Sequence, residues 1–384
     1  MKKIVKFLSY VLVAALSSLL TFAVFVGDAG SGETKLNRLE DLIGEKFIGE
    51  VDTVEIQDAA ADAMVNALGD RWSYYIPADE YAAYEEQMNN AYVGIGITIQ
   101  VAEDQSGYLI LKVNEGGPAD EAGLLPGDVM VAVEGQRTAE LDVDQTRNLV
   151  RGEENTQVLL TILRSGKTFD VFVTRKMVQT PVATSRMLPG GVGMITIANF
   201  DARCAEETIA AIEQLLKQGA VKLIFDVRFN PGGYADQLVE VLDYLLPEGD
   251  LFRTVDYAGN EAVDKSDKDC LKGVPMAVLV NSESYSAAEF FAAALREYDA
   301  AVVVGEHTVG KGYFQRTYEL GDGSAVGLSV GKYFTPKGIS LAEEGGIMPD
   351  VEILVDQETA AAIYAGTIDP MTDPQVLAAI EAMR

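Results

Sequence analysis

The pattern of apolar and polar positions divides the chain into four stretches of different character. An uncharged apolar run over residues 7–26 is long enough to cross a bilayer as a helix. Residues 34 to about 90 carry apolar side chains at helical spacing, whereas residues 92–175 alternate in short strand-like pieces. The remainder alternates strand and helix patterns, which predicts a parallel, covered sheet. The expected fold class is therefore an α+β multidomain protein.

The N-terminal run is a candidate membrane anchor. Lys2, Lys3 and Lys6 precede the apolar residues 7–26, and such lysines stay in the cytoplasm, so the rest of the chain is expected outside it. A cleaved signal peptide is the alternative, but the run is long and no clear Ala-x-Ala site follows it. The prediction is a single-pass anchor in the cell membrane, followed by a glycine-rich tether over residues 27–33.

Composition limits the partners of the part beyond the anchor. A net charge of −29 argues against binding to nucleic acid or to an anionic membrane surface. Cys204 and Cys270 are too few for a disulfide scaffold, and whether they pair stays open. His307 is the one histidine of the sequence, which argues against a zinc site of the usual His-rich kinds.

The strand-rich stretch contains a recognisable peptide-binding pattern. In residues 116–135 a Pro-Ala turn opens a short helix, Gly-Leu closes it, and Gly-Asp turns into a strand. A second helical segment is expected over residues 142–152. This pattern resembles a PDZ domain, in which backbone amides cradle a terminal carboxylate and the peptide adds a strand to the sheet edge. A small β domain without a ligand is the alternative. The resemblance places the carboxylate-binding loop at Gly94, Ile95, Gly96 and Ile97.

The last domain begins near Gly190 with a strand, a helix and an apolar second strand. That second strand ends in Asn-Pro-Gly-Gly at residues 230–233. Glycines at the carboxyl end of a buried strand let backbone N–H groups approach a ligand, although a plain turn is the alternative. A third buried strand at residues 276–280 leads into the serine-rich residues 282–286 and an alanine-rich helix over 287–298.

A serine at the start of this helix could be a nucleophile or a helix cap. The N–H groups at a helix start point outward and the helix dipole is positive there, so an oxyanion could be stabilised beside the serine. An ordinary cap is the commoner role for a serine in this position. The choice therefore depends on what could activate the hydroxyl.

Three chemistries compete for residues 281–315. A Ser-His-Asp triad would have to use His307, whose surroundings do not mark it as a base. Residues 305–311 nearly match a phosphate-binding loop, but Gly312 stands where a hydroxyl should follow and a strand pattern comes next. The third is a serine activated by a neutral lysine. Lys311 suits this role, because an apolar pocket can supply the about 4 kcal/mol that lowers a lysine pKa to near 7. A surface lysine is the alternative.

The order of these motifs is similar to that of the carboxy-terminal processing peptidases, also called tail-specific proteases. The resemblance covers nearly the whole chain, from anchor and PDZ-like part to Asn-Pro-Gly-Gly, the helix that begins in Ser-Tyr-Ser-Ala-Ala-Glu, and Gly-Lys-Gly-x-x-Gln. It also includes residues 68–80, 333–338 and 346–353, and the last helix. Family resemblance implies that the catalytic domain is an α/β domain of the ClpP/crotonase-like type.

The resemblance also implies a role for individual residues. Ser286 corresponds to the nucleophile, Lys311 to the general base and Gln315 to the glutamine that orients the lysine. The oxyanion hole corresponds to the amides of Gly232 and Ala287, one from the glycine turn and one from the helix start.

Three positions depart from the family pattern. Ala288 replaces a usual serine, Phe229 replaces a small or polar residue, and Ile339 replaces an arginine. These departures leave the proposed dyad intact and bear on substrate preference.

The function expected from the sequence is a membrane-anchored serine endopeptidase without metal or cofactor. Its PDZ-like domain would capture the C-terminal tail of protein substrates and gate the site, and cleavage would pass through an acyl-enzyme. A non-catalytic PDZ-type scaffold that binds protein C-termini is the alternative, and a homodimer built on the helical ends is a further possibility. The expected regions are the anchor and tether, the helical region, the PDZ-like domain, the peptidase domain and the last helix, at residues 1–33, 34–91, 92–177, 178–372 and 373–384.

Overall fold

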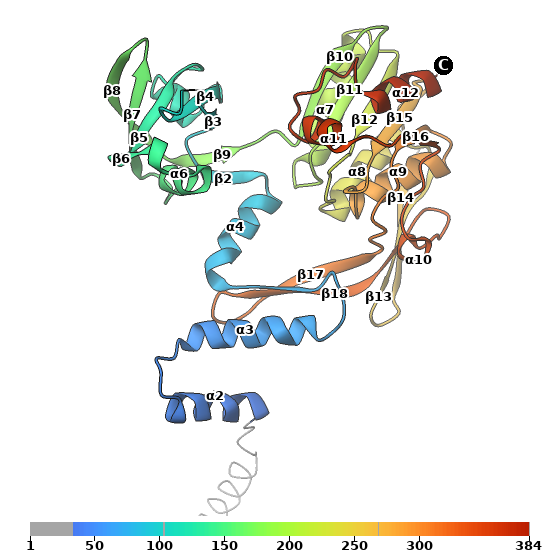
Figure 1. Cartoon of the computed structure of the whole chain (residues 1–384). Helices are drawn as coiled ribbons and strands as arrows, with labels where there is room; N and C mark the ends of the chain where they lie inside the picture. The colour runs from blue at the N-terminus through green and yellow to red at the C-terminus, as the bar shows by residue number, and fades with distance from the viewer. Residues whose placement is uncertain (1–33, 103, 268, 384) are drawn as a thin grey trace, which may run out of the picture. The chain divides into compact units, whose positions relative to one another are not determined.

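The computed structural model describes residues 34–102, 104–267 and 269–383 (Figure 1). The apolar run over residues 7–26, predicted as a membrane anchor, lies outside these residues. Within the described ranges, no helix is long and apolar enough to cross a membrane. The chain divides into two units between Gly69 and Asp70, and each is described by itself.

The first unit consists of two amphipathic helices, as the helical spacing of apolar residues predicts. They are α2 (Lys35–Lys46) and α3 (Thr53–Asn66). Each begins at a side-chain cap: the Thr34 hydroxyl accepts from the Asn37 N–H, and the Asp52 carboxylate accepts the first free N–H groups of α3.

The second unit contains an antiparallel sheet in the order β3-β4-β5-β7-β8, with β6 paired to β5. Its core is made by strand residues that point to one face, including Ile110, Met130 and Leu160. Helix α6 begins at a capping box between Asp142 and Gln145. The elements are β3 (Ile97–Val101), β4 (Tyr108–Val113), α5 (Pro118–Glu121), β5 (Val129–Val133), β6 (Gln136–Arg137), the 3₁₀ turn η1 (Thr138–Glu140), α6 (Val143–Val150), β7 (Gln157–Arg164) and β8 (Lys167–Thr174).

A two-stranded ribbon joins this sheet to the rest of the unit. Strand β2 (Ala91–Gly94) leads into the sheet, β9 (Lys176–Gln179) leads out of it, and the two pair antiparallel. We call this ribbon the stem. The chain therefore enters and leaves the small sheet at one place.

The part of the chain from residue 183 onward contains a six-stranded sheet in the order β10-β11-β12-β15-β16-β19. All its pairs are parallel except β10 with β11, which confirms the expected parallel sheet. Its elements are β10 (Ala183–Leu188), β11 (Val192–Ile197), α7 (Cys204–Lys217), β12 (Lys222–Asp226), α8 (Ala235–Leu245), β15 (Met276–Val280), α9 (Ala287–Glu297), β16 (Ala301–Gly305), β19 (Val351–Glu352), α11 (Gln357–Tyr364) and α12 (Pro374–Ala382).

Helices cover both faces of this sheet, because successive strand residues point to opposite sides. Phe225 and Val278 pack in a cluster with α7, α8 and α9. Their neighbours Ile224 and Ala277 pack instead with α12. This double burial explains why these strands are continuous apolar runs rather than alternating ones.

A second sheet of five strands contains one element that the sequence pattern missed. Residues 34 to about 90 were expected to be helical, but β1 (Tyr74–Ile76) pairs antiparallel with β18. Two tyrosines and an isoleucine fit a pleated surface, and Pro77 separates them from the following helix. The other elements here are α4 (Ala78–Met88), β13 (Gly249–Asp256), β14 (Glu261–Ser266), β17 (Tyr313–Glu319), β18 (Ala325–Phe334) and α10 (Leu341–Glu344).

A buried ion network ties the last helix to the central sheet. The Arg228 guanidinium, 7 % exposed, pairs with Asp226 at 2.6 Å and with Asp373 at 2.8 Å. Asp373 also caps α12 by accepting from the Gln375 and Val376 N–H groups. The network is satisfied on every side, so loss of one partner leaves an uncompensated buried charge.

We therefore expect Asp373→Ala to lower the free energy of unfolding by about 3–5 kcal/mol, since it removes an ion-pair partner and a helix cap together. The measurement is guanidinium denaturation of the full chain. Glu358→Ala, at an exposed position of α11, is the control and should change stability by about 0.5 kcal/mol or less. Equal stability of the two variants would contradict the role of the network.

Candidate active site

Ser286 lies at the junction of β15 and α9, at the N-cap position of the helix. Its backbone has φ 57° and ψ −126°, a conformation that side chains rarely adopt, and it is 8 % exposed. Gly232 permits the close approach of its turn to the serine, because a Cβ there would lie only 2.7 Å from the Ser286 Cβ. The Asn-Pro-Gly-Gly turn and the serine are thus pressed against each other, as the sequence suggested.

The buried carboxylate of Glu289 joins the serine to the lysine-bearing loop. Its Oε2 accepts from the backbone N–H groups of Ser286 and Lys311, both at 2.9 Å. Its Oε1 accepts from the Thr308 hydroxyl at 2.5 Å and from the Gly310 N–H at 2.7 Å. One side chain therefore fixes two backbone segments that lie 25 residues apart in sequence.

Lys311 lies in a mostly buried, aromatic environment. Its Nζ is 4.9 Å from the ring centre of Trp72 and 5.5 Å from that of Tyr285. Burial lowers the pKa of Lys311 to about 8, against the carboxylates of Glu289 and Asp70, which raise it. A substantial share of the side chain is therefore neutral near pH 8, which a general base requires.

Gln315 lies in the same cleft but does not contact Lys311 through any hydrogen bond found among the described residues. Its Nε2 donates to the Ser329 hydroxyl at 3.0 Å and to the Tyr313 carbonyl at 3.3 Å. Ser329 in turn donates its N–H to the Ser73 hydroxyl. A register shift of β17 against β18 between Phe314 and Gln315 accompanies this orientation.

The two amides implied for the oxyanion hole are adjacent. A Cβ on Gly232 would lie 2.9 Å from the Ala287 nitrogen, and Ala287 is the first residue of α9, where N–H groups point out of the helix. The Gly232 N–H, however, donates to the Asn230 Oδ1 at 2.8 Å. Asn230 is held in turn by its amide, which donates to the Ile197 carbonyl. In this conformation the Gly232 donor is engaged within its own turn.

These residues line a cleft of about 540 Å³. Ser286, Lys311, Gln315 and Gly232 all contribute to it. Much of the remaining lining is aromatic, from Tyr74, Tyr81, Tyr84, Tyr234, Tyr285, Phe314 and Tyr333. Within the described ranges, no group of acidic, cysteine or histidine side chains could hold a metal ion.

A second cleft, of about 250 Å³, lies between β3 and α6 of the small sheet. All four residues of the predicted carboxylate-binding loop line this cleft: Gly94, Ile95, Gly96 and Ile97. Met130, Val143 and Val150 add apolar walls, and Arg147 and Arg151 supply positive charge. Strand β3 is at the edge of its sheet, so an extended peptide could pair with it.

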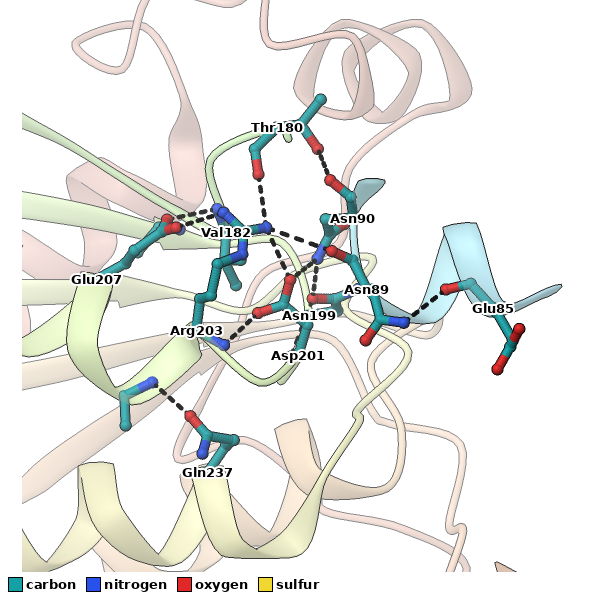
Figure 2. Close-up of polar contacts among 12 residues, drawn as sticks. Glu85, Asn89, Asn90, Thr180, Val182, Asn199, Asp201, Arg203, Glu207 and Gln237 are labelled. Atoms are coloured by element: carbon teal, nitrogen blue, oxygen red, sulfur yellow. Dashed lines mark hydrogen bonds and ion pairs between the residues drawn. The ribbon is translucent and has the colours of Figure 1, made fainter. Parts of the chain in front are cut away.

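Polar side chains from residues 199–207 hold the base of the stem by hydrogen bonds, and we call this set of contacts the clamp (Figure 2). Arg203 donates to the Thr180 carbonyl at 3.0 Å and to the Asn89 carbonyl at 3.4 Å, one on each side of the stem. Asn90 donates its side-chain amide to Asp201 at 2.9 Å. Glu207 accepts from the backbone N–H groups that follow Thr180, at Val182 and Ala183.

The same clamp reaches the glycine turn. Asn199 accepts from the Asn90 amide at 2.5 Å and also lines the active-site cleft. The next residue, Phe200, donates its N–H to the Gly232 carbonyl at 2.8 Å and accepts from the Tyr234 N–H. Two residues of one loop therefore link the stem to the turn beside Ser286.

The structure also shows the contacts of the other serines in this turn and of the residues that the rival chemistries would need. The Ser284 hydroxyl donates to the Val227 carbonyl, which is a turn role, and the Ser282 hydroxyl bonds Glu306. His307 is exposed, and β17 rather than a helix follows Gly312. The structure thus supports neither the triad nor the phosphate loop. Both cysteine thiols are free.

Sequence reasoning missed the roles of Glu289, Asn230 and Trp72. A signal existed for Glu289, since a serine followed three residues later by glutamate is the pattern of a helix start. Asn230 and Trp72 lie in segments that the family resemblance includes, but their contacts could not be predicted because they depend on segments distant in the sequence.

Comparison with known proteins identifies two domain families in the chain. Peptidase family S41 matches residues 191–353, which include Ser286 and Lys311. The PDZ domain family matches residues 109–164.

Whole-length relatives extend this similarity. The chain is 32 % identical over 329 residues to the carboxy-terminal processing protease CtpA of Bacillus subtilis, covering 84 % of this chain and 70 % of that protein. It is 31 % identical over 354 residues to a probable CtpA-like serine protease of Staphylococcus aureus, covering 89 % and 70 %.

A solved structure shows the same fold. It is a protein from Bacteroides fragilis described as an S41 protease, with a TM-score of 0.56 and 17 % identity, covering 88 % of this chain and 92 % of that one.

Lys311 should lose its proton with a midpoint near pH 8. Nuclear magnetic resonance of ¹³C-lysine-labelled protein measures this, with Lys311→Arg assigning the signal. Asp70→Asn should move the midpoint to lower pH, because the Asp70 carboxylate raises this pKa. Asp264→Asn, on β14 outside the cleft lining, is the control. A midpoint near the ordinary lysine value of about 10.4 would contradict the description of the pocket.

Proposed function

The chain belongs to the carboxy-terminal processing peptidases of family S41, and on this basis we propose that Ser286 and Lys311 form the catalytic dyad of a serine endopeptidase. The hydrogen bonds of Glu289 to both backbone segments carry the proposal, because they bring nucleophile and base into one cleft. The lowered pKa of Lys311 supports it, since a neutral lysine can accept a serine proton.

In the proposed reaction, Lys311 Nζ takes the proton from Ser286 Oγ as the oxygen bonds to the substrate carbonyl carbon. The protonated lysine then gives that proton to the leaving amine, which releases the C-terminal fragment and leaves an acyl-enzyme. Water attacks the ester by the same proton transfers in reverse and frees the serine. No metal or cofactor is needed for these steps.

The oxyanion would be stabilised by the N–H groups of Ala287 and Gly232. The second donor requires the Gly232 N–H to leave the Asn230 side chain, so the proposed active state differs from this conformation in that turn. Gln315, which lies in the same cleft, would orient Lys311 after releasing Ser329.

The groove between β3 and α6 would bind the C-terminal tail of a protein substrate. Glycine-flanked amides suit the terminal carboxylate, and the apolar walls suit the side chains near it. The clamp at the stem gives a route by which tail binding could gate the catalytic turn, through Arg203 and Phe200.

The proposal also includes the location of the enzyme, the fold type of its catalytic domain and its assembly. We place the catalytic part outside the cytoplasm, held by a membrane anchor over residues 7–26, on the strength of the lysines that precede that run. The catalytic domain is proposed to be of the ClpP/crotonase-like type, over residues 178–372. The helical ends remain candidates for a homodimer contact.

A non-catalytic scaffold that binds protein C-termini is the rival function. The tail groove alone would serve it. The buried Glu289 network favours the enzyme instead, since a scaffold has no use for a strained serine beside a buried lysine.

Ser286→Ala should abolish cleavage of a substrate with an unstructured C-terminal tail, because it removes the nucleophilic oxygen and keeps the Cβ and backbone. Cleavage is followed by mass spectrometry, and labelling with a serine-directed phosphonate by intact mass. Ser282→Ala, at the exposed end of the same turn, is the matched control and should retain activity. Full activity of the Ser286 variant, or a wild-type chain that binds tails without cutting or labelling, would favour the scaffold.

Tail recognition predicts that amidation of the substrate's C-terminus lowers kcat/KM about tenfold or more, since the amide lacks the charge that the loop binds. Ile97→Asp should weaken cleavage of the free-acid tail by placing a carboxylate beside the substrate's own, whereas Ile97→Val should not. Equal rates for acid and amide tails would rule out this role of the groove.

A further inference from the structure

The active-site cleft contains a cluster that the proposed catalytic steps do not use. It consists of Tyr74 on β1, Tyr81, Tyr84 and Glu85 on α4, and Thr317 on β17, all of which line the cleft with Ser286. We call these five residues the tyrosine subsite. They come from three elements and meet only in the folded chain, so local sequence requirements do not explain the cluster.

Three of the four hydroxyl groups of the subsite, those of Tyr74, Tyr84 and Thr317, have acceptor capacity but no spare protons. The Tyr74 hydroxyl is 2.8 Å from that of Tyr84 and 3.2 Å from that of Thr317, and the last two are 3.4 Å apart. Three hydroxyls carry three protons, and three mutual hydrogen bonds use all of them. Each oxygen still has a lone pair, so a ligand that meets this trio must donate.

The charge of the subsite itself is negative. Glu85 belongs to it, and the carboxylates of Glu319 and Glu85 lie close enough to Tyr81 to add to the burial that raises its pKa. Lys311 is the cationic residue of the cleft lining, and burial lowers its pKa to about 8, which reduces its positive charge as the pH approaches that value. A chain of net charge −29 adds a background field of the same sign.

The rings provide faces as well as hydroxyls. The Tyr81 and Tyr84 rings are stacked with centres 6.2 Å apart, and the Tyr74 and Tyr84 rings are tilted at 5.9 Å. Aromatic faces attract cations, and ring carbons cover the methylene stem of a long basic side chain. Proton acceptors, carboxylates and ring faces therefore all favour the same kind of ligand, a long side chain that is cationic and donates protons.

We propose that the tyrosine subsite binds a lysine or arginine side chain of the substrate segment next to the cut bond. The inference rests on the proposed peptidase function and adds a preference to it. Thr317 lies two residues beyond Gln315 on β17, which is roughly 7 Å along a strand, so the basic residue would lie a few positions from the cut. A neutral apolar side chain could stack on the same rings, but it would leave the acceptors and carboxylates without a partner.

The experiment uses the full chain and peptides that share one free C-terminal tail. At each of the four positions on either side of the main cut, one peptide carries lysine, one norleucine and one glutamate. Norleucine matches the lysine stem without its ammonium, so their kcat/KM ratio isolates the charge. At one position we expect lysine to exceed norleucine about fivefold to tenfold and glutamate by more.

Two variants and a control assign this ratio to the subsite. Glu85→Gln removes a carboxylate and Tyr84→Phe removes a hydroxyl while keeping the ring, so each should bring the lysine-to-norleucine ratio toward one. Tyr257→Phe, at a tyrosine that is 84 % exposed and outside the cleft, should leave the ratio unchanged. Phosphonate labelling of Ser286 in each variant shows whether the site is intact, and the wild-type ratio decides the question even if a variant fails to fold.

The outcomes separate the two proposals. A wild-type chain that cuts all peptides with no preference for lysine, or prefers norleucine, would overturn the basic-residue preference and leave the peptidase standing. A lysine preference that survives in both variants would place its origin elsewhere and overturn the subsite. A wild-type chain that cuts no peptide would refute the peptidase function, and this inference with it.

Discussion

The active site depends on one buried carboxylate. Glu289 is fully buried and accepts four hydrogen bonds, from the turn that carries Ser286 and from the loop that carries Lys311. A buried carboxylate is costly unless donors surround it, and here three backbone N–H groups and a hydroxyl do so at the start of a helix, where the dipole also favours negative charge. Because the donors belong to different segments, their placement cannot change independently.

The proposed catalytic groups are thereby positioned through the backbone rather than through their own side chains. The Lys311 ammonium lies between the rings of Trp72 and Tyr285, and the Gln315 amide donates to Ser329. The turn beside Ser286 also has two possible partners for the Gly232 N–H, the Asn230 side chain and a substrate oxyanion. The architecture therefore combines a fixed frame with contacts that the proposed active state would exchange.

Local patterns predicted what depends on local order. Helical spacing located α2, α3 and α7, and the apolar run of β15 indicated a strand covered on both faces, because amphipathicity and double burial leave periodic traces. The dyad candidates came from family motifs at Ser286 and Lys311. The strand β1 was missed because its three residues gain their pairing from β18, about 250 residues away.

The finer geometry of the site could not be predicted from the sequence, for a similar reason. That Gln315 donates to Ser329 depends on a register shift between two strands, and that Trp72 contacts Lys311 depends on how separate segments meet. The tyrosine subsite likewise joins Tyr74 to Thr317 across 243 positions. Motifs report which residues are present, whereas contacts of this kind are set by tertiary packing.

The backbone conformation of Ser286 has a consequence for which substitutions evolution can accept at this position. A side chain at φ 57° and ψ −126° costs about 1–3 kcal/mol, and glycine would adopt this conformation without that cost. Exchange of the serine for glycine would therefore remove the proposed nucleophile and at the same time relieve the backbone strain. Loss of catalysis is the thermodynamically favoured direction at this position, so only selection for the hydroxyl itself can maintain it. Family members that have become inactive by this route are expected to be at least as stable as their active relatives.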